Sequence, residues 1–270
     1  MSIKIENVEV VGWSPTIRGM RNPKNSWELN DSAPCMYSEN NVEHCVDCVY
    51  IEKCKCEEDD MYKNYIIGPN DHKLMMSLAN GGPVHAKYRR MITVYLDITA
   101  PLYWWKEFDT YKVGTVANSC STMHKIHAKE FTLDDFSCEH LLNMFNHNYD
   151  EREVPTIDMS PYNDNSIVFT PLGLLEQNIK MLNICREKYL IACKTEEETG
   201  IPAKDIWWQM IQLLPSSYNQ KRTIMLNYEV LHNIYFSRKN HKLDEWRELC
   251  KWIESLPYSE IITTKSKMED

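Results

Sequence analysis

The sequence lacks the features that mark several classes of protein. No segment approaches 18 consecutive apolar residues, so no membrane-spanning helix is predicted. The first 12 residues contain no apolar run behind a basic start, so they do not resemble a secretion signal. The sequence also shows no internal repeat and no low-complexity tract. These absences predict a cytoplasmic globular protein.

The chain has no excess of positive charge. Its 30 Lys and Arg against 39 Asp and Glu give a net charge of −9, which repels duplex phosphates and argues against a general nucleic-acid coat protein. A local basic pocket for a small anion remains compatible with this charge. With 270 residues, 43% of them hydrophobic, the chain is long enough to bury a real core. We expect a single domain over 1–270 with a Cys-rich insertion at about 30–60.

Hydrophobic periodicity predicts an α+β fold with few strands and many helices. A small central sheet flanked by helices is expected. Strands are predicted over 3–13, 91–98 and 222–226, and helices over 16–20, 71–78 (capped by Asn70), 102–109, 134–145, 171–193, 203–214, 227–238 and 241–256. The segment 113–125 is predicted to be a loop, and the tail from Tyr258 is predicted to fray.

Half of the ten cysteines cluster in one polar, aperiodic segment. They are Cys35, Cys45, Cys48, Cys54 and Cys56. Cys-x2-Cys is a usual half of a tetrahedral zinc site, and a structural metal would explain how such a segment stays ordered. A redox pair and unrelated thiols are the alternatives.

The predicted helix 227–238 carries polar residues at both ends of one face. Asn227, Leu231, Ile234 and Arg238 share this face, and its ends lie about 16 Å apart. An arginine on a core-facing stripe must either pair with a carboxylate or meet an anionic ligand. A solvated arginine near a helix C-terminus is the competing interpretation.

Two other segments carry groups that suit phosphate. Lys221 and Arg222 are adjacent cations, although solvated charges are the alternative. Between Lys112 and His124 lies a small, polar segment whose hydroxyl and backbone amide groups suit phosphate binding, although a plain polar turn would look the same.

About 100 residues of the chain resemble the flavin-dependent thymidylate synthases. In the centre, a strand ends at Ala100-Pro101 and leads through an aromatic helix to a Ser-rich loop. In the C-terminal half, the spacing from Pro215 to Asn227 and from Asn227 to Arg238 is similar to that of the family, and His241 follows. The early segment 17–21, with Arg18 and Arg21, is also similar.

The sequence departs from the family pattern at two phosphate-binding motifs. Where the family has Arg-His-Arg, this chain has Thr110-Tyr111-Lys112, so one cation remains. Where the family has Ser-x-Arg-Tyr, Ser121 is kept but Met123 replaces the arginine. A thioether cannot form the bidentate phosphate contact of a guanidinium.

The resemblance implies a cytosolic homotetramer that binds FAD and a dUMP-like nucleotide and transfers one carbon reductively to C5 of the pyrimidine. Reduced nicotinamide and a folate carbon donor would be further cofactors. Arg238 is the implied catalytic cation. Ser121 is the other implied nucleotide contact, and the implied cofactor contacts are Asn227, Lys112, Tyr111 and His241. Because the motif arginine is missing, Lys221 and Arg222 are the expected contacts to the nucleotide phosphate. The alternative functions are a non-catalytic protein that binds a nucleotide or flavin, and an interaction protein whose Cys-rich segment is held in place by a metal.

Overall fold

The structure is a computed structural model that describes residues 3–35, 65–141 and 170–265. The chain divides into two compact units. Within the described residues, the sheet unit comprises 3–35, 65–99, 107–118 and 221–265, and the helical unit comprises 100–106, 119–141 and 170–220. The fold class is α+β, as predicted, with a small antiparallel sheet flanked by helices. No helix in the described ranges combines the length and apolarity needed to cross a membrane.

The four-stranded sheet has the order β1-β4-β6-β5. Its strands are β1 (Lys4–Val11), β4 (Thr93–Pro101), β6 (Asn219–Asn227) and β5 (Val116–Ser119). β1 and β4 are antiparallel, and their register shifts between Glu6 and Glu9 at a bulge. Alternation places Val94, Leu96 and Ile98 on one face of β4, where they are buried.

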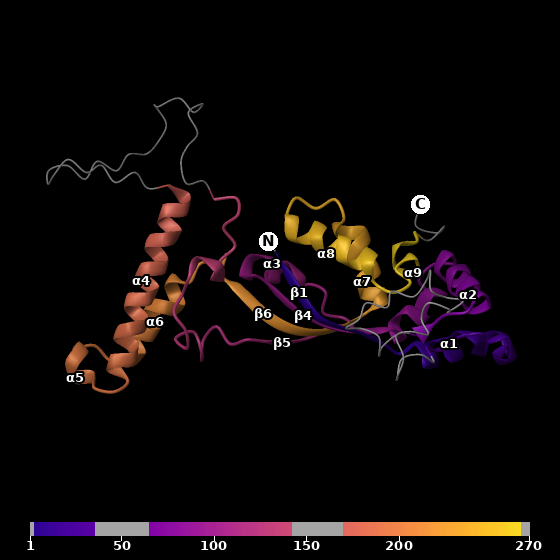
Figure 1. Ribbon diagram of the computed structural model, residues 1–270, viewed down its shortest axis with the longest axis horizontal. Coiled ribbons are helices and arrows are strands. Elements are labelled where there is room, and N and C mark those ends of the chain that lie inside the picture. Colours follow the sequence, from indigo (N-terminus) through magenta and orange to yellow (C-terminus); the bar gives the residue numbers. More distant parts are fainter. Residues whose placement is uncertain (1–2, 36–64, 142–169, 266–270) are drawn as a thin grey trace, which may run out of the picture. The chain divides into compact units, whose positions relative to one another are not determined.

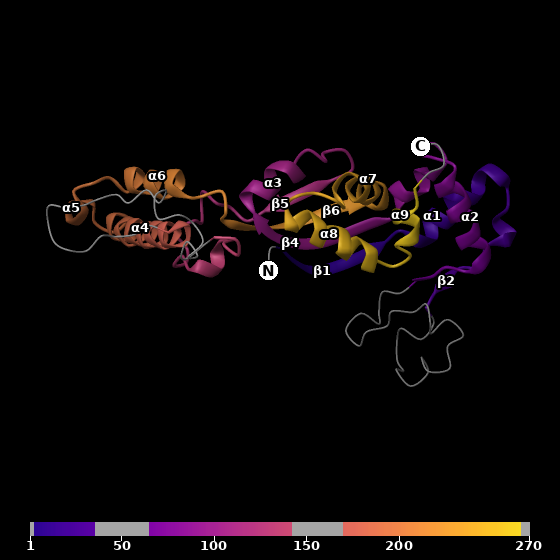
Figure 2. The same ribbon diagram turned by 90° about the horizontal axis from the view of Figure 1, so that it is seen from above.

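Two C-terminal helices cover one face of this sheet (Figures 1 and 2). They are α7 (Tyr228–Arg238) and α8 (Asp244–Ser255). Leu231 and Ile234 of α7 and Trp246 of α8 are fully buried, which is why both helices stay on the sheet. The remaining elements of the sheet unit are α1 (Trp13–Arg21), η1 (Asn22–Lys24), η2 (Trp27–Leu29), β2 (Ala33–Pro34), β3 (Tyr65–Ile66), α2 (Pro69–Asn80), η4 (Ala86–Met91) and α9 (Glu260–Thr263).

A buried ion pair connects α1 to α2. The Nε of Arg21 donates to Oδ1 of Asp71 at 2.6 Å, and both side chains are almost fully buried. The same guanidinium donates to the carbonyls of Ser26 and Leu29, and Oδ2 of Asp71 accepts from Ser32. Every charge of the pair therefore has a partner, and the pair fixes the segment that follows α1.

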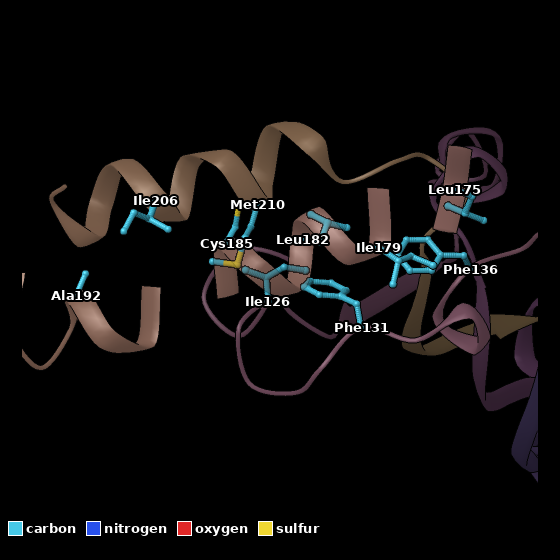
Figure 3. Close-up of a cluster of buried hydrophobic side chains, with 10 residues drawn as sticks. All are labelled: Ile126, Phe131, Phe136, Leu175, Ile179, Leu182, Cys185, Ala192, Ile206 and Met210. Carbon is cyan, nitrogen blue, oxygen red and sulfur yellow. The ribbon is translucent and has the colours of Figure 1, made fainter. Parts of the chain in front are cut away.

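The helical unit is built around α4 (Pro171–Ala192) and α6 (Ala203–Leu213), with the short α5 (Glu196–Thr199) between them. Its core contains side chains from both helices and from the segment 126–136 (Figure 3). The members of this core are Ile126, Phe131, Phe136, Leu175, Ile179, Leu182, Cys185, Ala192, Ile206 and Met210. α3 (Leu102–Phe108) begins in this unit, where Trp104 and Trp105 are buried.

Most predicted elements are present, but three predictions were wrong. The predicted helix 134–145 is replaced, in its described part, by η5 (Leu133–Asp135) and an extended Phe136 that bridges to Tyr218. The predicted loop 113–125 contains β5, and the tail folds into α9, where Ile261 and Ile262 are fully buried. In each case tertiary packing decided the conformation where local periodicity was weak.

Two helix starts also differ from the prediction. α1 begins at Trp13, three residues earlier than predicted, because Pro15 fits within its first turn. α2 begins at Pro69 after Gly68, so Asn70 lies inside the helix and is not its cap. Both differences concern a proline, which is compatible with the first turn of a helix because its missing N–H would have no partner there.

Removing the carboxylate of Asp71 should strongly destabilise the sheet unit. Asp71→Ala leaves the buried guanidinium of Arg21 without its charge partner, so the free energy of unfolding should fall by about 3–5 kcal/mol. Urea denaturation of the full chain measures the loss. Asp244→Ala removes an exposed partner of Arg247 and should cost under about 1 kcal/mol. Equal losses for the two variants would show that the Arg21–Asp71 pair does not stabilise the fold.

Candidate functional site

Arg238, the last residue of α7, is held by three side chains of the sheet unit. Its Nη1 donates to Oε2 of Glu107 at 2.8 Å, and its Nε donates to the hydroxyl of Tyr111 at 2.9 Å. The guanidinium carbon lies 4.6 Å from the ring centre of Trp246, within the range of a cation–π contact. Of the two partners that the sequence required for this arginine, a carboxylate or an anion, the carboxylate is present.

Glu107 is the centre of the cluster. Its Oε2 also accepts from the indole Nε1 of Trp246 at 2.9 Å, and Nε2 of His241 lies 3.6 Å away. The Nδ1 of His241 accepts from the backbone N–H of Leu243, so the ring proton of a neutral imidazole sits on Nε2 and faces Glu107. The Arg238 cluster, as we call Glu107, Tyr111, Arg238, His241 and Trp246, thus brings together three of the predicted site residues.

The Arg238 cluster retains unused hydrogen-bonding capacity. Within the described residues, neither Nη2 of Arg238 nor Oε1 of Glu107 has a hydrogen-bond partner. The two side chains are 20% and 36% exposed, so solvent or a ligand can reach them. One donor and one acceptor are therefore available on a pair whose net charge is zero.

Asn227 lies at the opposite end of α7, where it caps the helix. Its Oδ1 accepts from the backbone N–H of Val230 at 3.0 Å. The amide nitrogen lies against Gly114, where a Cβ would stand only 2.8 Å from it, and Gly114 has φ +78. Next to this glycine, the buried hydroxyl of Thr115 has no partner among the described residues, and Lys112 is exposed and forms no ion pair there.

The two cations of β6 point to opposite faces of the sheet and do not form a joint site. Arg222 pairs with Asp109 at 2.7 Å, whereas Lys221 pairs with Asp97 at 3.0 Å and with Glu6 at 3.6 Å. Hydrogen bonds from Thr223, then Asn7 and Lys221, lower the pKa of Asp97 to about 2. Lys221 therefore faces a carboxylate that stays ionised, and its own pKa is raised mainly by the hydrogen bond to Asp97.

Ser121 belongs to the helical unit, where it stabilises a local turn. Its hydroxyl accepts from the backbone N–H groups of Met123 and His124, and its side chain is exposed. Of the early arginines, Arg18 is exposed and Arg21 is fully used by Asp71 and two carbonyls. The polar segment around Ser121 is thus a structured turn in which the hydroxyl can still donate a hydrogen bond.

The predicted metal site lies almost wholly outside the described residues. Cys45, Cys48, Cys54 and Cys56 fall in that part of the chain, while Cys35 is described and buried. In the described ranges, no group of three or more His, Cys, Asp or Glu side chains is arranged to hold a metal.

Sequence reasoning missed Glu107 and the role of Trp246. A core-facing Arg238 requires a carboxylate, but the chain has 39 acidic residues and no local pattern selects one. Trp246 is fully buried, as expected of a core residue, yet its indole ring also contacts the guanidinium. Glu107 lies at the end of α3, only four residues before Tyr111 in the sequence, and this proximity was the one available signal.

The comparison with solved structures identifies the fold. Over 99% of this chain and 100% of the other, it is similar to the flavin-dependent thymidylate synthase ThyX from Helicobacter pylori complexed with FAD and dUMP, with a TM-score of 0.54 and 14% identity. A second structure of ThyX from this organism with FAD and dUMP gives a TM-score of 0.52 at 11% identity, over 98% and 100% of the chains. No family model matches the sequence, and a search of curated proteins finds no match. The chain thus has a ThyX-like fold.

Gly114 should be intolerant of any side chain. Gly114→Ala combines a positive φ with a Cβ against the amide of Asn227, so it strains the backbone and displaces the cap of α7. We expect a loss of about 2–3 kcal/mol in the free energy of unfolding. Gly200→Ala is the matched control, because Gly200 has φ +63 but an added Cβ there would meet no atom within 4 Å, and it should cost only about 1 kcal/mol. If denaturant titrations give equal losses, the contact with Asn227 is unimportant.

Proposed function

We propose that this protein binds a flavin and a dUMP-like pyrimidine nucleotide, and that it catalyses a flavin-dependent, reductive one-carbon transfer to C5 of the base. The observation that carries the proposal is the Arg238 cluster, which holds a guanidinium at the end of α7 with one donor unused. The ThyX-like fold supports it, since the similar structures contain FAD and dUMP.

The unused atoms of the Arg238 cluster suit the edge of a uracil ring. Nη2 of Arg238 is a donor and Oε1 of Glu107 an acceptor, and uracil offers O4 as an acceptor beside N3–H as a donor. Because the Arg–Glu pair is neutral overall, it favours a polar ring edge over a phosphate dianion. We therefore assign the base to this pair and the phosphates to other groups.

Chemistry at C5 requires electron density to be moved onto that carbon. A donor at O4 stabilises the negative charge that develops on this oxygen, and such stabilisation contributes a few kcal/mol to catalysis, about 3–4 for one donor. Glu107, Tyr111 and Trp246 keep Arg238 oriented, so the guanidinium need not reorganise during the reaction. C5 then exchanges its proton for the incoming carbon.

The residues around Gly114 fit a flavin nucleotide. The hydroxyl of Thr115 is buried without a described partner, Lys112 offers an ammonium that forms no ion pair within the described ranges, and the backbone of Gly114 packs directly against the amide of Asn227. These groups would hold phosphate oxygens and a polar ring edge. The flavin, when bound, supplies the hydride. A reduced nicotinamide, a folate carbon donor and a homotetrameric assembly remain part of the proposal through the family resemblance. A structural zinc held by the Cys-rich segment remains part of it through the spacing of the cysteines.

A non-catalytic nucleotide or flavin binder is the second candidate function, and one observation favours it. Of the four cations assigned to phosphates or base from the sequence, Lys221, Arg222 and Arg238 all form ion pairs, which leaves Lys112. A protein that had lost the catalytic activity but kept the fold would show such cations paired with acidic residues of its own chain.

The purified chain should be yellow and should bind dUMP through Arg238. A bound flavin gives an absorbance band at about 450 nm. Arg238→Gln removes a charged donor, so the Kd for dUMP measured by calorimetry should rise by about tenfold to a hundredfold. Lys242→Ala, which removes an exposed cation four residues along the chain, should leave the Kd unchanged.

The pattern of results separates the candidates. Colourless protein that binds dUMP and shows no turnover with added flavin would support the non-catalytic binder. Equal Kd values for Arg238→Gln and Lys242→Ala would remove Arg238 from the nucleotide site. Circular dichroism of both variants verifies that the fold is intact, because losing the partner of Glu107 could itself disturb the cluster.

A further inference from the structure

We propose that a basic surface of the sheet unit binds single-stranded nucleic acid. The basic surface, as we define it, consists of Arg18 of α1, Lys24 of η1, Trp27 of η2, and Lys87 and Arg90 of η4. It shares no residue with the Arg238 cluster or with the groups around Gly114, so this binding does not depend on the proposed function.

Two segments of the sequence contain no acidic residue, although the chain as a whole is acidic. Residues 10–27 and 72–96 carry seven lysines and arginines and no Asp or Glu, whereas the net charge of the chain is −9. The fold brings these two segments together, because α1 packs on η4. A local excess of positive charge on an acidic protein is the electrostatic signature of a surface that binds a polyanion.

The buried cations of these segments are neutralised by the fold, and the exposed ones are not. In the interior, Arg21 pairs with Asp71 and Arg89 pairs with Glu229. The four cations of the basic surface are instead exposed, and none of them forms an ion pair with another described residue. Glu28, which follows Trp27, offsets one of the four charges. The remaining positive charge is available to a ligand.

Lys87 and Arg90 project from one face of η4. This element is a 3-10 helix, in which side chains at i and i+3 lie above one another. The burial pattern agrees, because Ala86 and Arg89, which are also three residues apart, are both buried. The two exposed cations are separated by about 6 Å along the helix axis, close to the rise of two stacked nucleotides. One strand can therefore place a phosphate at each of them.

Trp27 supplies an aromatic ring beside Arg18. Its Nε1 donates to Oδ1 of Asn22 at 2.8 Å, and Asn22 lies one helical turn after Arg18 on the same face of α1. The side chain of Trp27 is 50% exposed. An exposed indole that is held next to a cation provides a surface on which an unpaired base can stack.

The two parts of the basic surface adjoin each other. Met91, the last residue of η4, lies against Gly19 of α1, where an added Cβ would stand 3.3 Å from the Sδ of Met91. Gly19 follows Arg18 and Met91 follows Arg90, so cations from both elements border this contact. A strand that contacts η4 can therefore continue over α1.

The basic surface suits a single strand better than a duplex. Trp27 requires a base with an accessible face, and the bases of a duplex are stacked on one another. A flexible strand can follow a small basic area, whereas a rigid duplex would extend over the acidic remainder of the chain. Four phosphate contacts predict weak binding with a slope of log K against log salt of about −3, at about −0.7 per contact.

Fluorescence anisotropy of the full chain with a labelled single strand of about 15 thymidines tests the proposal. At about 50 mM salt we expect a Kd of about 1–100 µM, which should rise about fiftyfold at about 200 mM salt. Trp27→Ala removes the stacking surface and should raise the Kd at least about fivefold. It should leave the salt slope unchanged, because no phosphate contact is lost.

Reversing the charges of η4 should remove most of the affinity. Lys87→Glu combined with Arg90→Glu replaces two phosphate contacts by two repulsions, so the Kd should rise more than about tenfold and the salt slope should fall to about −1.4. Lys242→Glu combined with Lys251→Glu is the matched control, because it changes the charge of the same unit equally at exposed positions, and its effect should be far smaller. Circular dichroism should show an unchanged fold for both variants.

The outcomes that would overturn the proposal are distinct. They are a lack of binding at low salt, equal effects of the two charge reversals, and tighter binding of a duplex than of the single strand. Displacement of the strand by saturating FAD would assign these cations to a cofactor phosphate and would also overturn it. The dUMP titration at Arg238 is a separate measurement, so either proposal can fail alone.

Discussion

The guanidinium of Arg238 lies between a carboxylate, a phenol and an indole, and the candidate site depends on that enclosure. A cation placed near a protein core is tolerated only when its charge and its donors have partners. Glu107 and Tyr111 supply them from one segment of the sheet unit and Trp246 from another. The same contacts hold these segments against the end of α7, so the shape of the site and the stability of its surroundings arise from one set of interactions.

The neutrality of the Arg238–Glu107 pair limits what the site can recognise. A lone arginine attracts anions of any kind, whereas a guanidinium already neutralised by a carboxylate gains little from a phosphate. What remains is directional hydrogen bonding, which suits a planar ring with adjacent donor and acceptor atoms. The absence of arginine from the two motifs therefore agrees with the proposal, in which the loop around Gly114 contacts phosphate and Arg238 of α7 contacts the base.

The sequence predicted the helices best and the contacts between segments least. The long periodic helices α4, α6 and α8 were found within a few residues, because each has an unbroken apolar stripe. The short β5 and the buried α9 were missed, since four residues carry too little periodicity and their conformation depends on distant partners. At the site, spacing along α7 was sufficient to select Arg238, but the choice of Glu107 among all acidic residues depended on the fold. The prediction of Asn227 as a site residue also omitted its role as a helix cap, although asparagine before an apolar run is the usual signal for one.

The small β2–β3 ladder has a consequence for how this fold accommodates change. Ala33 pairs with Ile66 and Pro34 with Tyr65, so the backbone on both sides of the Cys-rich segment is joined at its base. The Arg21–Asp71 pair and its hydrogen bonds fix the chain just before and after this base. Because the cost of closing a loop grows only with the logarithm of its length, a segment anchored in this way can be lengthened, shortened or exchanged at little expense to the remainder. The segment between β2 and β3 can therefore change in length and sequence without altering the candidate site at the end of α7.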